Sequence, residues 1–142
     1  MRRGFYAGTI LLLLVGCSKY ENGPDFSMKS KTERLCNNWV VNEASQTSGD
    51  SVCAFLNVYC NYQWNISRDK QYSTTYKPNG MGNHVEMGTW KFNDDKTHLL
   101  CTSNSGAVVD YYILRLDNNQ LWVRFTDEIG EWELHLFPKS TD

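Results

Sequence analysis

Apolar and polar residues alternate with a period of two along most of the chain beyond residue 61. The pattern is sharpest near the C-terminus, where the apolar positions are Leu121, Val123 and Phe125 in one segment and Trp132, Leu134 and Leu136 in the next. Successive side chains of a β-strand point to opposite faces, so this alternation indicates strands with one buried face. No segment of ten or more residues keeps the 3.6-residue period of an amphipathic helix. The chain is therefore predicted to be all-β.

Eight such segments follow one another, separated by short runs of turn residues such as Asp117-Asn118-Asn119. They span residues 38–44, 62–67, 71–76, 86–92, 97–102, 112–116, 121–126 and 132–136. Sequential strands with short turns favour an up-and-down antiparallel meander, and closing it into a barrel removes the exposed strand edges. We expect a small eight-stranded antiparallel barrel, with a two-sheet β-sandwich as the alternative. Residues 51–61 fit a short helix and a strand equally well, so their structure is left open.

The N-terminal segment has a basic start, Met1-Arg2-Arg3, and then an apolar run that ends at Cys17. The run holds about ten residues, which is too short to cross a bilayer and fits the core of a signal peptide. Its last four residues, Leu14-Val15-Gly16-Cys17, resemble the lipobox of bacterial lipoproteins. The resemblance implies that residues 1–16 are a signal peptide and that Cys17 carries acyl chains such as palmitate. Secretion without lipid is the alternative.

This interpretation divides the chain into three parts. Residues 17–30 are polar and contain Gly23-Pro24, so they are predicted to be a flexible tether between the lipidated cysteine and a barrel domain of residues 31–142. We expect the chain to be anchored in the bacterial cell envelope, in the outer membrane, with the leaflet left open. One domain is what the length prior gives for a chain of this size.

The charge of the chain excludes one large class of partners. Without Arg2 and Arg3, the 14 basic residues fall to 12 against 16 acidic ones, a formal charge of −4. A mildly acidic chain with no basic run lacks the electrostatic footprint of a nucleic-acid-binding protein. Attachment to a membrane would come from the acyl chains instead, because two or more chains give stable anchoring. The oligomeric state is left open.

The cysteines suggest disulfide bonds. Besides Cys17 there are four, Cys36, Cys53, Cys60 and Cys101, an even number in a chain that is expected to be exported. We predict two bridges, with three possible pairings, and free buried thiols are the alternative. No Cys-x-x-Cys or Cys-x-x-His occurs, so no structural metal site is expected.

Four segments resemble a known family. They are Leu35–Val41, Trp64–Tyr72, Gly88–Phe92 and Tyr112–Leu121, and together they are similar to the bacterial lipocalin-like lipoproteins, over roughly residues 31–139. Asn37 and Lys70 stand where glycines are usual in that family. The resemblance implies a lipocalin-like barrel that binds a small, largely apolar ligand in its mouth. The shared motifs are structural, so they speak to fold more than to function.

The candidate ligand-binding residues are the bulky aromatic side chains that the alternation points inward. They are Trp90, Phe92, Tyr112, Phe125 and Trp132. The same residues are large enough to fill a small barrel, in which case Trp90 is a plug at the barrel floor and Gly88 permits a close approach. A filled barrel would make the chain a structural or interaction lipoprotein that contacts envelope proteins or glycans. Trp122 is predicted to face outward, where it could stack on a sugar or a partner.

No catalytic constellation is found. The three histidines, His84, His98 and His135, lie in no nucleophile or metal motif, and Glu131 and Glu133 share the solvated face of one strand. We therefore expect no enzymatic activity, no cofactor and no metal. Asp50-Ser51-Val52 resembles a short O-glycosylation motif of exported bacterial proteins, and whether Ser51 is glycosylated is left open.

Overall fold

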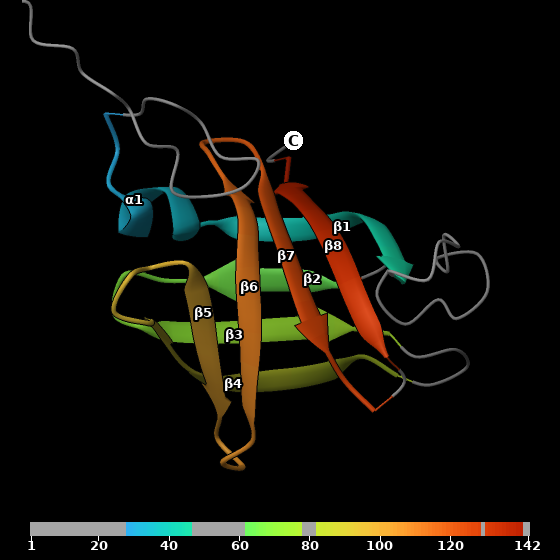
Figure 1. Cartoon of the computed structure of the whole chain (residues 1–142). Coiled ribbons are helices and arrows are strands. Elements are labelled where there is room, and N and C mark those ends of the chain that lie inside the picture. The colour runs from blue at the N-terminus through green and yellow to red at the C-terminus, as the bar shows by residue number, and fades with distance from the viewer. Residues whose placement is uncertain (1–27, 47–61, 78–81, 129, 141–142) are drawn as a thin grey trace, which may run out of the picture.

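The architecture is an eight-stranded antiparallel barrel (Figure 1). A computed structural model describes residues 28–46, 62–77, 82–128 and 130–140. The elements are α1 (Lys31–Leu35), β1 (Asn38–Gln46), β2 (Gln63–Ile66), β3 (Gln71–Tyr76), β4 (His84–Phe92), β5 (His98–Ser103), β6 (Val108–Leu116), β7 (Leu121–Thr126) and β8 (Glu131–Pro138). Each strand pairs with the next along the chain, and β8 pairs with β1 to close the barrel. The predicted closed meander is confirmed, and the sandwich alternative is wrong.

A β-bulge in β6 changes which of its residues face the core. The pairing of β6 with β7 shifts register between Ile113 and Arg115, which leaves Leu114 as an extra residue. Tyr111 and Ile113 are buried before the bulge, and Leu116 is buried after it. The expectation that Tyr112 faces inward is therefore wrong. Unbroken alternation counted back from Leu116 would bury Tyr112, whereas the bulge shifts the count by one residue and buries Tyr111 instead. Tyr112 is half-buried and its ring lies 5.1 Å from that of His98 on the outer wall.

The interior of the barrel is largely filled by its own side chains. Trp39, Trp64 and Trp132 are each at most 1% exposed. Around them the core is built from the inward positions of β5 to β8, mainly Leu99, Ile113, Leu116, Leu121, Val123, Leu134 and Leu136. Eight strands give an interior just wide enough for such side chains, so free space is expected only near an end of the barrel.

One end of the barrel is closed by α1. Ser30 caps the helix and forms a capping box with Glu33, which fixes the start of this short helix. Leu35 is fully buried and its carbonyl oxygen accepts a hydrogen bond of 2.8 Å from the indole of Trp39. The guanidinium of Arg34 donates to the carbonyl of Leu116 at the end of β6, at 2.8 Å. These contacts tie the helix to both β1 and β6.

Gly88 lies where two backbones come unusually close. It pairs with Ser103 of β5, and a Cβ atom built at this position would lie 2.0 Å from the carbonyl oxygen of Thr102. The expected close approach at Gly88 is therefore made by the β5 backbone. Trp90, two residues on, is 2% exposed, donates its indole N–H to the carbonyl of Ser67 and lies beneath the ammonium of Lys70.

The expectation of two disulfides is wrong for Cys36 and Cys101, which are both free thiols. The two cysteines lie in different parts of the fold: Cys101 points inward from β5, opposite Trp90, whereas Cys36 caps the C-terminus of α1. Burial raises the pKa of the Cys101 thiol well above its ordinary value. Cys53 and Cys60 lie outside the described residues, as do Cys17 and Ser51.

Candidate functional site

The end of the barrel away from α1 contains a hollow of about 460 Å³, here called the mouth cavity. α1 contacts the last residue of β6, whereas the cavity lies at the first residues of that strand, so the two features mark opposite ends. The lining residues are Tyr62, Thr74, Tyr76, Glu86, Val108, Val109, Tyr111, Phe125, Thr126, Asp127 and Glu128. The volume is in the range of pockets that hold small organic molecules.

Four aromatic rings form the walls of the mouth cavity. Tyr62 and Tyr76 are stacked on one side, with ring centroids 5.7 Å apart and planes 21° apart. Tyr111 and Phe125 form the other side, with centroids 5.0 Å apart. The ring of Trp64 lies 4.8 Å from that of Tyr111, and Trp64 is itself buried, so the aromatic surface continues into the core. A guest in this cavity would rest on ring faces.

Glu86 brings a carboxylate into this aromatic setting. It is half-buried, shares the inward phase of β4 with Gly88 and Trp90, and pairs in register with Thr74 of β3. The phenol of Tyr72, deeper in the barrel, donates a hydrogen bond of 2.9 Å to Glu86 Oε1. Burial, and then the hydrogen bond to Glu86, raise the pKa of Tyr72 well above its ordinary value, so this phenol remains a donor.

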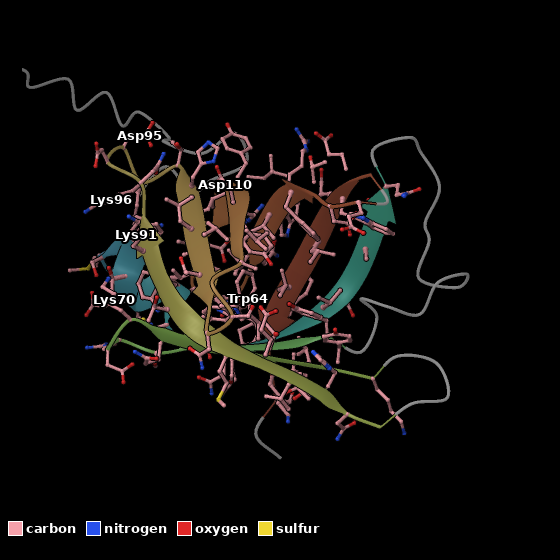
Figure 2. The ribbon with its side chains drawn as sticks, turned by 90° about the horizontal axis from the view of Figure 1, so that it is seen from below. Trp64, Lys70, Lys91, Asp95, Lys96 and Asp110 are labelled. Atoms are coloured by element: carbon pink, nitrogen blue, oxygen red, sulfur yellow. The ribbon has the colours of Figure 1, made fainter. Side chains whose placement is uncertain are left out.

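Two further carboxylates, Asp127 and Glu128, stand at the rim. Asp127 Oδ1 accepts hydrogen bonds of 3.0 Å from the backbone N–H of Gly130 and from the indole N–H of Trp132, so Asp127 also shapes the turn between β7 and β8. Glu128 is exposed. No lysine or arginine is among the described residues that line the cavity. In Figure 2 the labelled Lys91 and Lys96 lie on the flank of the molecule, away from Trp64.

The hydroxyl of Thr74 is the least expected polar group in the cavity. Thr74 is 1% exposed, and its Oγ1 has no hydrogen-bond partner among the described residues. The phenol of Tyr62 lies close to this hydroxyl and to Tyr111, and both contacts lower the pKa of Tyr62, although burial raises that pKa more. A buried hydroxyl without a partner is costly, and such a group in a native structure calls for a guest or a bound water.

The five predicted ligand residues are not brought together by the fold. Phe125 lines the mouth cavity. Trp132 pairs with it across β7 and β8, but its indole is 1% exposed and bound to Asp127. Trp90 and Phe92 pack edge to face at 5.5 Å, beside the β2–β3 turn. Tyr112 lies on the outer wall, as described above.

Sequence reasoning missed the cavity residues on β3 and β4, although part of the signal was present. The alternation does place Tyr72, Thr74 and Tyr76 on one face. The same phase on β4 runs from Trp90 back through Gly88 to Glu86. A charged residue is rarely expected inside a small barrel, so a search restricted to bulky aromatic residues passes over Glu86.

On the outer wall, the ring of Trp122 is packed between side chains of the two neighbouring strands and is not a free aromatic surface. The ring of Trp122 on β7 lies 4.1 Å from that of His135 on β8, with planes 13° apart, and the guanidinium of Arg115 on β6 lies 5.2 Å from its centroid. Neighbouring strands thus cover Trp122 from both sides. Burial alone would raise the pKa of Glu133, but hydrogen bonds from His135 and Arg124 hold it below its ordinary value.

A second hollow, of about 590 Å³, lies on the outer wall and is here called the outer groove. It is lined by His98, Val108, Val109, Asp110, Tyr112, Arg124, Phe125, Thr126 and Glu131. The pairing of β6 with β7 begins only at Tyr112, so the first part of β6 diverges from β7. The outer groove and the mouth cavity lie on the two sides of this divergence and share four lining residues.

No group of three or more His, Cys, Asp or Glu side chains among the described residues is placed to hold a metal ion.

Within the same residues, no helix has the length and apolar character that crossing a bilayer requires.

Comparisons with known proteins bear on the fold. No protein-family model and no curated protein matches the chain. Among solved structures, the barrel is similar to a lipocalin-like protein from Bacteroides uniformis, with a TM-score of 0.55 and 11% identity over 75% of this chain and 99% of that one. It is also similar to an uncharacterized protein from Bacteroides eggerthii, with a TM-score of 0.51 and 8% identity over 71% of this chain and 97% of that one. These likenesses show a lipocalin-like fold.

Proposed function

We propose that the chain is a membrane-anchored lipocalin-like lipoprotein that binds one small organic molecule in the mouth cavity. The observation that carries the proposal is the cavity itself, a hollow of about 460 Å³ between four aromatic rings at one end of a barrel whose remainder is filled. Because the core leaves little space below Trp64 and Tyr111, the guest stays at the mouth. We assign no chemical reaction to this site.

Native mass spectrometry of the full chain tests ligand binding. The chain is purified from bacterial membranes in a non-ionic detergent, and its native and denatured masses are compared. We expect a discrete excess in the native mass that disappears on denaturation and corresponds to a molecule small enough for the cavity. Equal masses from several growth conditions would count against a ligand-binding role.

Two matched variants test whether such a ligand lies against Val109, which lines both the mouth cavity and the outer groove. Val109→Phe adds bulk to a half-buried residue that lines the cavity, and Val85→Phe adds the same bulk to a residue that is 54% exposed. We expect Val109→Phe to abolish the excess mass and Val85→Phe to retain it. Retention of the excess in both variants would place the ligand elsewhere on the chain.

The proposed anchor is supported by the sequence Leu14-Val15-Gly16-Cys17 at the end of the short apolar run. In cells fed an alkyne analogue of palmitate, we expect the full chain to be labelled and to sediment with the membranes. Cys17→Ser should lose all of the label, because the acylated thiol is removed, whereas Cys36→Ser should keep it. Equal labelling of the two variants would exclude Cys17 as the acylated residue.

A second candidate function is that of an interaction lipoprotein with a filled barrel. The outer groove favours this alternative, because it is a second hollow on the wall with the polar residues Asp110, Arg124 and Glu131 on its surface. Such a protein would contact an envelope protein or a glycan. If native and denatured masses agree, crosslinking in cells from a photoreactive residue at position 110 should capture a discrete partner.

A further inference from the structure

We infer, on the basis of the proposed function, that the ligand is a small organic cation whose ammonium group is held by Glu86 and whose apolar body rests on Tyr62, Tyr76, Tyr111 and Phe125. The proposal names a chemical class, an amine or quaternary ammonium compound with an apolar or aromatic body. It differs from the general expectation of an apolar guest, because the described surface of the cavity carries negative charge.

The charged residues that line the mouth cavity are all acidic. Glu86, Asp127 and Glu128 line it, and none of its described lining residues is a lysine or arginine. Of these carboxylates, Glu86 on β4 is expected to attract a cation most strongly. It is half-buried, and electrostatic attraction is stronger there than at the surface. An anionic guest would be repelled from this position, and a neutral guest would leave the carboxylate without a counter-charge.

The rings around Glu86 suit a cation as well as an apolar body. The faces of aromatic rings attract cations, and cages of such rings recognise quaternary ammonium groups. The stacked pair of Tyr62 and Tyr76 and the pair of Tyr111 and Phe125 present this surface on two sides. Burial raises the pKa of Tyr62 well above its ordinary value, so its ring remains a neutral phenol.

The hydroxyl of Thr74 supplies an independent indication that the cavity is built for a polar guest. It lines the cavity, pairs in register with Glu86, is 1% exposed and has no hydrogen-bond partner among the described residues. Glu86 already accepts a hydrogen bond from Tyr72, on Oε1. An ammonium group placed between Glu86 and Thr74 would donate one hydrogen bond to the carboxylate and another to the hydroxyl.

The test compares three probes of similar size and different charge. These are 2-phenylethylammonium, the neutral 2-phenylethanol and the anionic 3-phenylpropionate. Binding to the full chain in non-ionic detergent is measured by isothermal titration calorimetry. We expect the cation to bind at least tenfold more tightly than the alcohol, and the carboxylate to show no measurable binding.

Two substitutions of glutamate by glutamine identify the group responsible. Glu86→Gln keeps the shape of the side chain and an acceptor for Tyr72, so it should bring the affinity for the cation down to that for the alcohol, which should change less than twofold. Glu131→Gln removes an exposed carboxylate from the outer groove and should change neither affinity. If Glu86→Gln lowers the yield of folded protein, Glu128→Gln at the exposed rim should still lower the affinity for the cation two- to threefold.

The outcomes separate this inference from the proposed function. Equal binding of the cation and the alcohol, or tighter binding of the alcohol, would overturn the cation proposal and leave a ligand-binding barrel in place. So would a ligand in the native mass spectrum that carries no positive charge. Absence of binding by all three probes, together with equal native and denatured masses, would overturn both.

Discussion

Replacing Gly88 with alanine is expected to lower the free energy of unfolding by about 3 kcal/mol, the upper end of the usual cost of forcing extra atoms into a packed interior. The new Cβ would lie 2.0 Å from the carbonyl oxygen of Thr102 and 2.8 Å from the Cα of Ser103. Both are backbone atoms of the strand that pairs with Gly88. Relief would require β4 and β5 to separate, which would break hydrogen bonds in the barrel wall.

Urea unfolding of the full chain, followed by tryptophan fluorescence, measures this effect. Gly82→Ala is the matched control, because a Cβ at Gly82 would meet nothing within 4 Å. The control should stay within about 0.5 kcal/mol of the wild type, as surface substitutions usually do. A similar stability for the two variants would show that the close approach of β4 and β5 at Gly88 does not constrain the fold.

Replacing Trp39 with alanine is expected to cost about 3–5 kcal/mol, the range for truncating a large aromatic residue in a core. Trp39 is fully buried, so its removal leaves a cavity that the surrounding wall cannot fill. The substitution also removes the indole N–H that donates to the carbonyl of Leu35. The closed end of the barrel would therefore lose packing and its link to α1 together.

The same truncation on the outer wall is the control for Trp39. Trp122→Ala removes a half-buried ring that lies against His135 and Arg115 but contributes little to the core. We expect it to cost at least 2 kcal/mol less than Trp39→Ala in the same unfolding experiment. An equal loss would mean that the stacked row on the wall stabilises the barrel as much as the interior does.

The strand pattern was predictable because alternation is a local property of the sequence. The bulge in β6 was not, because its extra residue, Leu114, continues the apparent alternation of Tyr112 and Leu116 that an unbroken strand would show. Its effect is confined to the residues before it, where Tyr111 takes the buried place expected for Tyr112. A one-residue shift in the alternation thus leaves the prediction of fold class correct, but it makes the prediction of which side chains face the interior wrong.

The candidate site was harder to predict than the fold. Its lining residues come from β3, β4, β6 and β7, from Tyr62 just before β2, and from the turn after β7. The cavity therefore depends on how far β6 diverges from β7, which no local pattern encodes. The cysteines illustrate the same difficulty, since an even number suggests pairing and only the fold shows that Cys36 and Cys101 lie apart. Glu86 has an inward phase in the sequence, but burying a carboxylate makes sense only once its phenol partner Tyr72 is seen.

The closure of the barrel by α1 has a consequence for the route of ligand exchange. α1 begins at Lys31, at the closed end, and the proposed lipid lies upstream of that residue in the sequence. The mouth cavity is at the opposite end, so the proposed anchor would join the molecule on its closed side. A ligand would then be captured from the aqueous phase or handed over by another protein, rather than drawn laterally out of the membrane.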